Sequence, residues 1–194
     1  MKYSIKWLIE NNEGKEYLFF WGHQPSKDGS VTKSCLSQWW ICDFTYENVN
    51  YKCTEQWMMS QKALLFDDKE VFEEILLTDD PSLMKKLGRK IRNFNESLWN
   101  KKKYDIVLFG NYLKFGQNKT LKEFLLNTDN LILVEASPYD NIWGIGMKSD
   151  DKNINNPNLW KGENLLGFAL TEVKEILKNN KTVIKTNNEI TVEN

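Results

Sequence analysis

Hydrophobic residues recur at helical spacing in the stretch TEQWMMSQKALLF, residues 54–66, and predict an amphipathic helix with Thr54 as its N-cap. Its broad apolar face is formed by Met58, Met59, Ala63, Leu65 and Phe66. Glu55 and Lys62 are seven residues apart, so they lie on this same face, about 10 Å apart along the helix axis. A soluble helix rarely places a carboxylate and an amine in its buried stripe. These two residues are therefore candidates for function.

The rest of the chain predicts more helices than strands. Aromatic, β-favouring runs indicate strands and loops in residues 1–53, and the aliphatic run LILVEASP, residues 131–138, predicts one further strand. Helices are predicted in residues 67–78, 81–90, 93–101, 103–117, 121–128 and 164–178. This order favours an α+β fold, predominantly α-helical, in one compact domain spanning residues 1–178. The tail, residues 179–194, is expected to be either a hairpin turning at Asn187 and Asn188 or disordered.

Composition and charge exclude some classes of protein. The 194 residues are 41% hydrophobic and 27% charged, and 26 basic against 27 acidic side chains leave a net charge of −1. This balance gives no overall attraction to nucleic acid or to an anionic membrane, and the sequence lacks the run of about 18 apolar residues that a membrane helix needs. Three cysteines without paired spacing and one histidine do not make a convincing zinc site. We therefore expect a cytoplasmic protein with reduced thiols, no membrane association and no bound metal.

Lys62 and Glu55 suggest a specific chemistry if the face that they share is buried. Burial lowers the pKa of a lysine, and a neutral amine can attack a carbonyl carbon to form a Schiff base. Glu55 on the same face could then act as a general acid or base. In the alternative interpretation, Lys62 extends its amine to solvent and Glu55 is only a charge in the first helical turn.

Other candidates follow along the chain, each with an ordinary alternative. Glu135 interrupts the aliphatic strand at its end, a common place for catalytic side chains, or it faces solvent. Asp140 lies in a glycine-containing loop that allows close approach to a ligand, or it is a turn residue. Trp99 and Trp143 could stack on a planar base or belong to the core. Arg89, at a predicted helix end, could bind a phosphate or interact with the helix dipole.

Five segments, in this order and spacing, resemble one family: TEQWMMSQKALLF, LGRKIRNFNESLW, KFGQNKTLKEFLLNT, LVEASPYDNIWGIG and WKGENLLGFAL. The resemblance is to the YbiA-like family, also called the NADAR superfamily for its proposed link to NAD and ADP-ribose, and it extends from about residue 19 to 178. It implies a compact, mostly helical α+β domain that hydrolyses the N-glycosidic bond between a ribose and a nitrogenous base. One branch of the family cleaves phosphoribosylated intermediates of riboflavin biosynthesis, and another removes ADP-ribose from guanine in nucleic acid.

The resemblance also implies roles for particular residues. The family lysine, implicated in a Schiff base with the opened ribose, matches Lys62, and the family glutamate matches Glu55. The carboxylates of the V-E-A-S-P-x-D segment match Glu135 and Asp140, although some relatives differ in this segment. We expect Lys62 to be the nucleophile, Glu55 and Glu135 to handle protons, and Asp140 to be a polar anchor. The expected substrate-binding residues are Trp99, Trp143 and Gly144 from the resemblance, and Arg89 from its helix end.

Two functions of different class remain open. The first is an N-glycosidase that needs no cofactor and acts on an ADP-ribose- or phosphoribose-linked base, either in ADP-ribosylated DNA or RNA or in a small riboflavin intermediate. The second is a non-catalytic module that binds ADP-ribose or a related nucleotide. Basic residues between 85 and 92 and at 101–103 could border a nucleic-acid site or be ordinary solvated helix faces. We expect a monomer or a small homo-oligomer.

Overall fold

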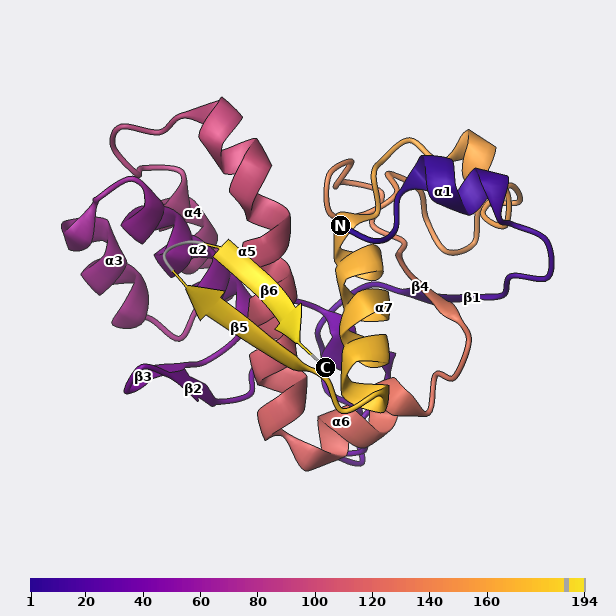
Figure 1. Ribbon diagram of the computed structural model, residues 1–194, viewed down its shortest axis with the longest axis horizontal. Helices are drawn as coiled ribbons and strands as arrows, with labels where there is room; N and C mark the ends of the chain where they lie inside the picture. The colour runs from indigo at the N-terminus through magenta and orange to yellow at the C-terminus, as the bar shows by residue number, and fades with distance from the viewer. Residues whose placement is uncertain (187–188, 194) are drawn as a thin grey trace.

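Helices account for most of the regular structure in the computed structural model, which describes residues 1–186 and 189–193 (Figure 1). The helices are α1 (Ile5–Glu10), α2 (Thr54–Leu65), α3 (Lys69–Leu76), α4 (Pro81–Gly88), α5 (Glu96–Gln117), α6 (Lys119–Leu126) and α7 (Leu165–Lys178). The strands are β1 (Tyr17–Phe20), β2 (Phe44–Tyr46), β3 (Val49–Tyr51), β4 (Ile132–Glu135), β5 (Thr182–Thr186) and β6 (Glu189–Glu193), and short 3-10 turns occur at η1 (Lys33–Leu36) and η2 (Pro157–Leu159). The predicted α+β fold dominated by helix is confirmed.

Three details differ from the sequence prediction. Residues 5–10, expected among strands and loops, form α1, because Ser4 caps it by accepting a hydrogen bond from the Trp7 amide at 3.1 Å. The two helices expected at 93–101 and 103–117 form the single helix α5. The junction sequence NKKKY contains neither glycine nor proline, so nothing interrupts the helix there. α2 includes Thr54 as its first residue, so Cys53 occupies the N-cap position instead.

α2 is an inner helix rather than an amphipathic surface helix. It packs against α3, α4 and α5, and most of its side chains are buried. Trp57 is fully buried and donates a hydrogen bond from its indole nitrogen to the Ile106 carbonyl of α5 at 2.8 Å. Gly110 allows this close approach, since a Cβ there would lie 2.3 Å from Trp57 Cδ1. Polar side chains of α2 are therefore enclosed on nearly every side, and each needs a partner or a function.

β1 and β4 form a parallel pair, with Phe20 opposite Glu135 at their carboxyl ends. α7 packs against β4 (Figure 1). Because both strands run in the same direction, the loops that follow them, residues 21–24 and 136–144, leave from the same edge. Glu135 and the loop that carries Asp140 are thereby brought next to the loop that follows β1.

The chain ends in an antiparallel pair of strands that follows α7. Thr182 lies opposite Glu193 in the register, and Thr186 lies opposite Glu189. β5 contacts both α5 and α7, and β6 contacts α5 (Figure 1). The turn predicted at Asn187 and Asn188 falls outside the described residues.

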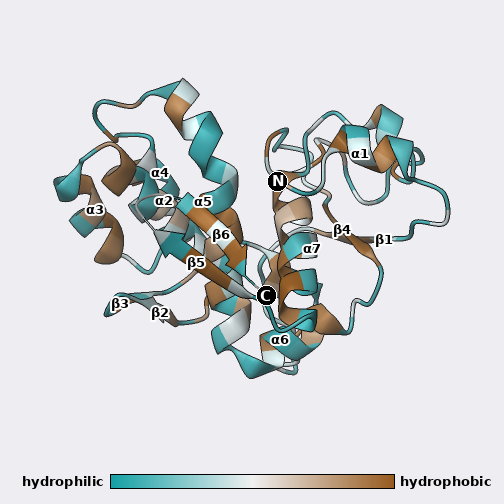
Figure 2. Cartoon of the chain, in the orientation of Figure 1, coloured by the Kyte–Doolittle hydropathy of each residue, from teal (hydrophilic) through white to brown (hydrophobic). Residues whose placement is uncertain are grey.

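The hydropathy of each helix and strand agrees with its position in the fold. Figure 2 shows mainly hydrophobic residues on β4 and on much of α7, where both contribute to the core. The outer helices α3 and α6 carry hydrophobic and hydrophilic residues side by side, as expected for helices with one face in water (Figure 2). Within residues 1–186 and 189–193, no helix is long and apolar enough to cross a membrane.

Candidate functional site

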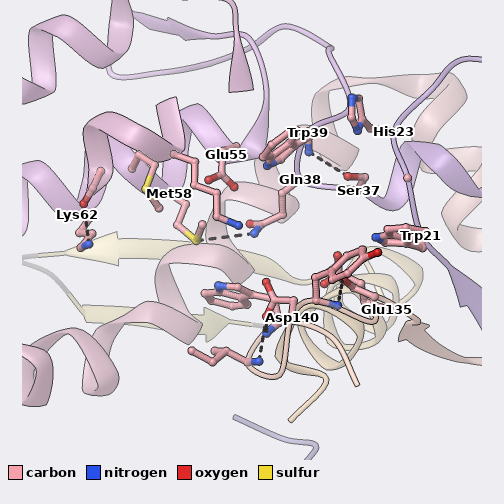
Figure 3. Close-up of a pocket in the computed structure, with 18 of the residues that line it drawn as sticks. Trp21, His23, Ser37, Gln38, Trp39, Glu55, Met58, Lys62, Glu135 and Asp140 are labelled. Atoms are coloured by element: carbon pink, nitrogen blue, oxygen red, sulfur yellow. Dashed lines mark hydrogen bonds between the residues drawn. The ribbon is translucent and has the colours of Figure 1, made fainter. Parts of the chain in front are cut away.

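A cavity of about 570 Å³ lies between α2, α4, the start of α5 and the loops that follow β1, η1 and β4 (Figure 3). Segments far apart in the sequence thus meet at one place. The predicted site residues that line the cavity are Glu55, Lys62, Arg89, Trp99, Glu135, Asp140 and Trp143. The remaining predicted site residue, Gly144, lies outside the lining.

Glu55 is buried in the first turn of α2, with 2% of its surface exposed. Its Oε1 atom is inaccessible to solvent and has no hydrogen-bond partner among the described residues. Burial raises the pKa of the Glu55 carboxyl from 4.5 to about 7, and the positive charge of Lys85 and a hydrogen bond from Trp39 only partly oppose this rise. The side chain points toward the cavity rather than to bulk water (Figure 3). At neutral pH, Glu55 can therefore either give or take a proton.

Glu135 is the last residue of β4, and its Oε2 atom is likewise inaccessible and unpartnered among the described residues. Burial raises the pKa of this carboxyl to about 8, and the negative charges of Asp140 and Glu55 raise it further. The backbone is fixed, because the Glu135 amide donates to Asn164 Oδ1 at 2.9 Å. The alternative interpretation, a strand-end residue that faces bulk solvent, does not hold, since Glu135 lines the cavity (Figure 3).

Lys62 lies one turn before the end of α2 and is half-buried. Its Nζ donates to the Gly88 carbonyl at 2.8 Å, and it lies 4.4 Å from the centroid of the Phe94 ring and 5.5 Å from that of Trp99. Burial lowers the pKa of the Lys62 amine, and the neighbouring charge of Arg89 lowers it further. The amine thus remains at the cavity wall, with a larger neutral fraction than a surface lysine has.

Asp140 closes the loop after β4 as an Asx turn, the ordinary alternative for this residue. Its Oδ1 accepts hydrogen bonds from the amides of Ile142 at 2.9 Å and Trp143 at 2.8 Å, while the residue still lines the cavity. Gly144 lies beneath this loop, where a Cβ would be 2.8 Å from the Glu135 carbonyl oxygen. The glycine therefore allows the loop to pack against the end of β4, and it does not contact the cavity.

The outer part of the cavity combines aromatic rings with positive charge. Trp99, in the first turns of α5, and Trp143, in the loop after β4, are half-buried lining residues. Arg89 and Lys85, at and near the end of α4, are exposed and also line the cavity. Carboxyl groups in the interior and cations at the rim suit a ligand with an uncharged polar part and an anionic part.

Comparison with known proteins identifies the family. The model of the NADAR domain matches residues 19–178. The chain belongs to the NADAR family. The NMR structure of the Escherichia coli protein YbiA has the same fold, with a TM-score of 0.68 and 23% identity, over 86% of this chain and 87% of that chain. The resemblance inferred from the five sequence segments is confirmed.

Two curated NADAR relatives carry names that describe a function. A protein of Acanthamoeba polyphaga mimivirus named as an N-glycosidase is 43% identical over 169 residues, which cover 84% of this chain and 97% of that protein. A riboflavin biosynthesis protein of Vibrio vulnificus is 25% identical over 178 residues, which cover 92% of this chain and 43% of that protein. This chain therefore corresponds to nearly the whole of the first relative and to less than half of the second.

The cavity of this NADAR domain also contains residues that the sequence did not single out. Gln38 and Trp39 enter it from the loop after η1, and Trp21 enters from the loop after β1 (Figure 3). Tyr139 lines it from the loop after β4. Trp21 and Tyr139 remain exposed, with ring centroids 6.1 Å apart. Residues 1–53 were expected only to form strands and loops. Gln38 stands directly before the aromatic run that starts at Trp39, and no local pattern marks it as a residue of the cavity.

The described residues of the NADAR domain offer no evident set of metal-ligating side chains. Within the part of the chain that the structure describes, no group of three or more His, Cys, Asp or Glu side chains is arranged to hold a metal ion. Cys35 and Cys53 are buried as free thiols, and burial raises the pKa of each to about 12. These thiols are therefore protonated packing groups at neutral pH. The cavity wall carries instead the carboxyl groups of Glu55, Glu135 and Asp140 and the amines of Lys62 and Lys85.

Proposed function

We propose that this NADAR protein is an N-glycosidase that hydrolyses the bond between a ribose and a nitrogenous base. The observation that carries the proposal is the pair of carboxyl groups of Glu55 and Glu135, each with one buried oxygen that has no partner among the described residues, on the wall that also holds Lys62. Glycoside hydrolysis needs two carboxyl groups in different states, one protonated to give a proton to the leaving group and one ionised to activate water. The name of the mimivirus relative supports the same reaction.

The two carboxyls suit different halves of the reaction. Glu135, with a pKa of about 8, holds its proton at neutral pH and can donate it to the leaving nitrogen as the C1′–N bond breaks. The electron pair of that bond leaves with the base, and positive charge develops at C1′. Glu55, with a pKa of about 7, is ionised in a large fraction of molecules, stabilises this charge and takes a proton from the attacking water. The products are the free base and the free sugar.

Lys62 provides a covalent variant of this reaction. In an N-glycoside whose ribose ring has opened, the neutral amine bonds to C1′, and the base leaves with a proton from a carboxyl group. The resulting Schiff base then adds water at C1′, which releases the sugar as an aldehyde and regenerates the amine. The lowered pKa of Lys62 favours the neutral form that this attack requires. We expect Lys62 to act as this nucleophile.

The residues at the rim of the cavity indicate which substrates could bind. Trp99 and Trp143 can hold a planar base, Asp140 can anchor a polar group, and Arg89 with Lys85 can bind a phosphate. Two substrates meet these requirements: guanine linked to ADP-ribose in DNA or RNA, and the phosphoribosylaminopyrimidine of riboflavin biosynthesis. The Vibrio relative's name supports the second. A nucleic-acid substrate would bind more weakly as salt is added, with a steep dependence that a small substrate does not show.

The test offers the purified protein each substrate separately and follows the released base and sugar by mass spectrometry. Wild type should cleave one of them, Glu55→Gln and Lys62→Ala should lower the rate about 100-fold or more, and Lys86→Ala, an exposed lysine of α4 outside the cavity, should not.

A trapping experiment tests the covalent variant of the reaction. Borohydride added during turnover should reduce the Schiff base and leave the sugar attached at Lys62. Wild-type rates in Lys62→Ala would exclude the covalent variant. No cleavage of either substrate, with ADP-ribose still bound, would identify a binding module instead.

A further inference from the structure

Gln38 presents an unused hydrogen-bond acceptor to the cavity. The side chain follows η1, is 6% exposed and points between α2 and the loop of Asp140 (Figure 3). Its Oε1 is inaccessible to solvent and has no partner among the described residues, and its Nε2 makes only a long contact of 3.8 Å with Met58 Sδ. The amide oxygen is therefore unused, and the amide nitrogen is held only by this weak hydrogen bond to sulfur.

A buried acceptor without a donor is costly, and native proteins rarely keep one without a reason. Among the described residues, the unpartnered buried side-chain oxygens belong to Gln38, Glu55, Asn111 and Glu135. All of these except Asn111 line the same cavity. This concentration of acceptors predicts a ligand that brings several O–H or N–H donors to the cavity interior.

Gln38 is also held in place before any ligand binds. Its carbonyl accepts a hydrogen bond from the Glu55 amide at 3.0 Å. On its other side, the fully buried Lys114 donates from Nζ to the carbonyls of Cys35 at 2.7 Å and Ser37 at 2.9 Å. The backbone on both sides of the amide is therefore fixed, which lowers the entropic cost of using it for recognition.

We propose that Gln38 is a substrate-binding residue whose amide hydrogen-bonds a donor group of the ribosyl-linked base, beside Glu55. The inference rests on the proposed function. An amide suits this position because it does not ionise, so it accepts a hydrogen bond without competing for the proton that the reaction moves. The donor is either a ribose hydroxyl or an N–H of the base.

The test compares Gln38→Met, which keeps the length of the side chain and removes its polar atoms, with Gln61→Met. Gln61 is a buried glutamine of α2 that lies outside the cavity. Calorimetry measures binding of ADP-ribose, ribose 5-phosphate and guanine. Loss of one hydrogen bond should weaken binding roughly five- to tenfold in Gln38→Met only. Weakening of both sugar probes places the contact on the ribose, and weakening of guanine alone places it on the base.

Steady-state kinetics distinguish failure of this inference from failure of the proposed function. With the substrate that wild type cleaves, Gln38→Met should raise KM more than it lowers kcat, and the pH profile should keep its shape because no ionisable group is lost. An unchanged KM, with unchanged binding of all three probes, would overturn the role of Gln38 and leave the glycosidase intact. A wild type that neither cleaves a substrate nor binds a probe would overturn both. Should Gln38→Met fail to fold, Gln38→Asn, which withdraws the amide by one methylene group, should show the same weakening.

Discussion

Asp68, the N-cap of α3, and the two glutamates of the cavity each have a carboxyl oxygen that solvent does not reach, but their surroundings differ. Asp68 accepts hydrogen bonds from the Arg92 amide at 2.8 Å and from Arg92 Nη2 at 2.6 Å. Hydrogen bonds from the Arg92 side chain and amide lower the pKa of Asp68 to about 2. Glu55 and Glu135 each keep one buried oxygen without a partner, and their pKa values rise to about 7 and about 8.

The difference in hydrogen bonding indicates that Asp68 stabilises the fold, whereas Glu55 and Glu135 are suited to proton transfer. The fully paired Asp68 joins the start of α3 to the segment before α5, and its lowered pKa of about 2 keeps it ionised at neutral pH. The incompletely hydrogen-bonded glutamates destabilise the fold when they ionise, and a sequence selected for stability alone would have replaced them with apolar side chains. Their retention in the cavity agrees with a role in proton transfer.

The largest expected effect comes from removing the proton of Glu135. Glu135→Gln should lower kcat about 100-fold or more, because the leaving base loses its proton donor. The temperature of unfolding should stay the same or rise, because an amide carries no charge to be desolvated. Steady-state kinetics with the cleaved substrate and calorimetry measure the two quantities. A variant that keeps wild-type kcat would transfer the role of acid to another group.

Asp68 should respond in the opposite way. Asp68→Asn removes the acceptor charge that Arg92 and the α3 N-terminus share, so the temperature of unfolding should fall by several degrees. Because Asp68 does not line the cavity, kcat and KM should match those of wild type. Scanning calorimetry and kinetics on one preparation test both statements. If folded Asp68→Asn lost as much kcat as Glu135→Gln, the assignment of a purely structural role to Asp68 would be contradicted.

Local sequence patterns could predict the part of the site that α2 and β4 carry. Helical periodicity places Glu55 and Lys62 on one face, and both line the cavity. The aliphatic run that ends at Glu135 marks β4 and the position of its carboxyl group. In each case, the spacing along one element fixes the direction of the side chain. The catalytic roles of these residues stay predictions.

Other parts depend on contacts between distant segments, which local patterns do not record. Gln38 is fixed by Lys114, whose hydrogen bond to the Cys35 carbonyl joins residues 79 positions apart. Gly144 belongs to a motif of the family, yet it lies under its loop because the chain closes tightly over the Glu135 carbonyl. α1 was missed because its six residues give too short a pattern to distinguish from the aromatic runs around it.

The last expected effect is a dependence of stability on pH. Each cavity glutamate has a folded pKa above its ordinary value of 4.5, so between pH 4.5 and about 7 to 8 the folded state binds more protons than the unfolded chain. The free energy of unfolding should therefore fall as pH rises through this window, by at most about 1.4 kcal/mol per pH unit for each carboxyl. Asp68 contributes nothing to this slope, because its stabilisation is lost only as pH falls from 3.8 toward 2.

Urea unfolding at pH 5, 6, 7 and 8 measures the slope in wild type and in the Glu55→Gln, Glu135→Gln double variant. Subtracting the two curves removes every group that the variants share, so the difference reports the two carboxyls alone. The double variant should gain stability relative to wild type as pH rises, and the gain should level off above about pH 8. Parallel curves would mean that both carboxyls titrate near 4.5 and find partners or water in solution. Such a result would contradict the raised pKa values that distinguish the two glutamates from Asp68. It would also contradict the assignment of Glu135 as the general acid.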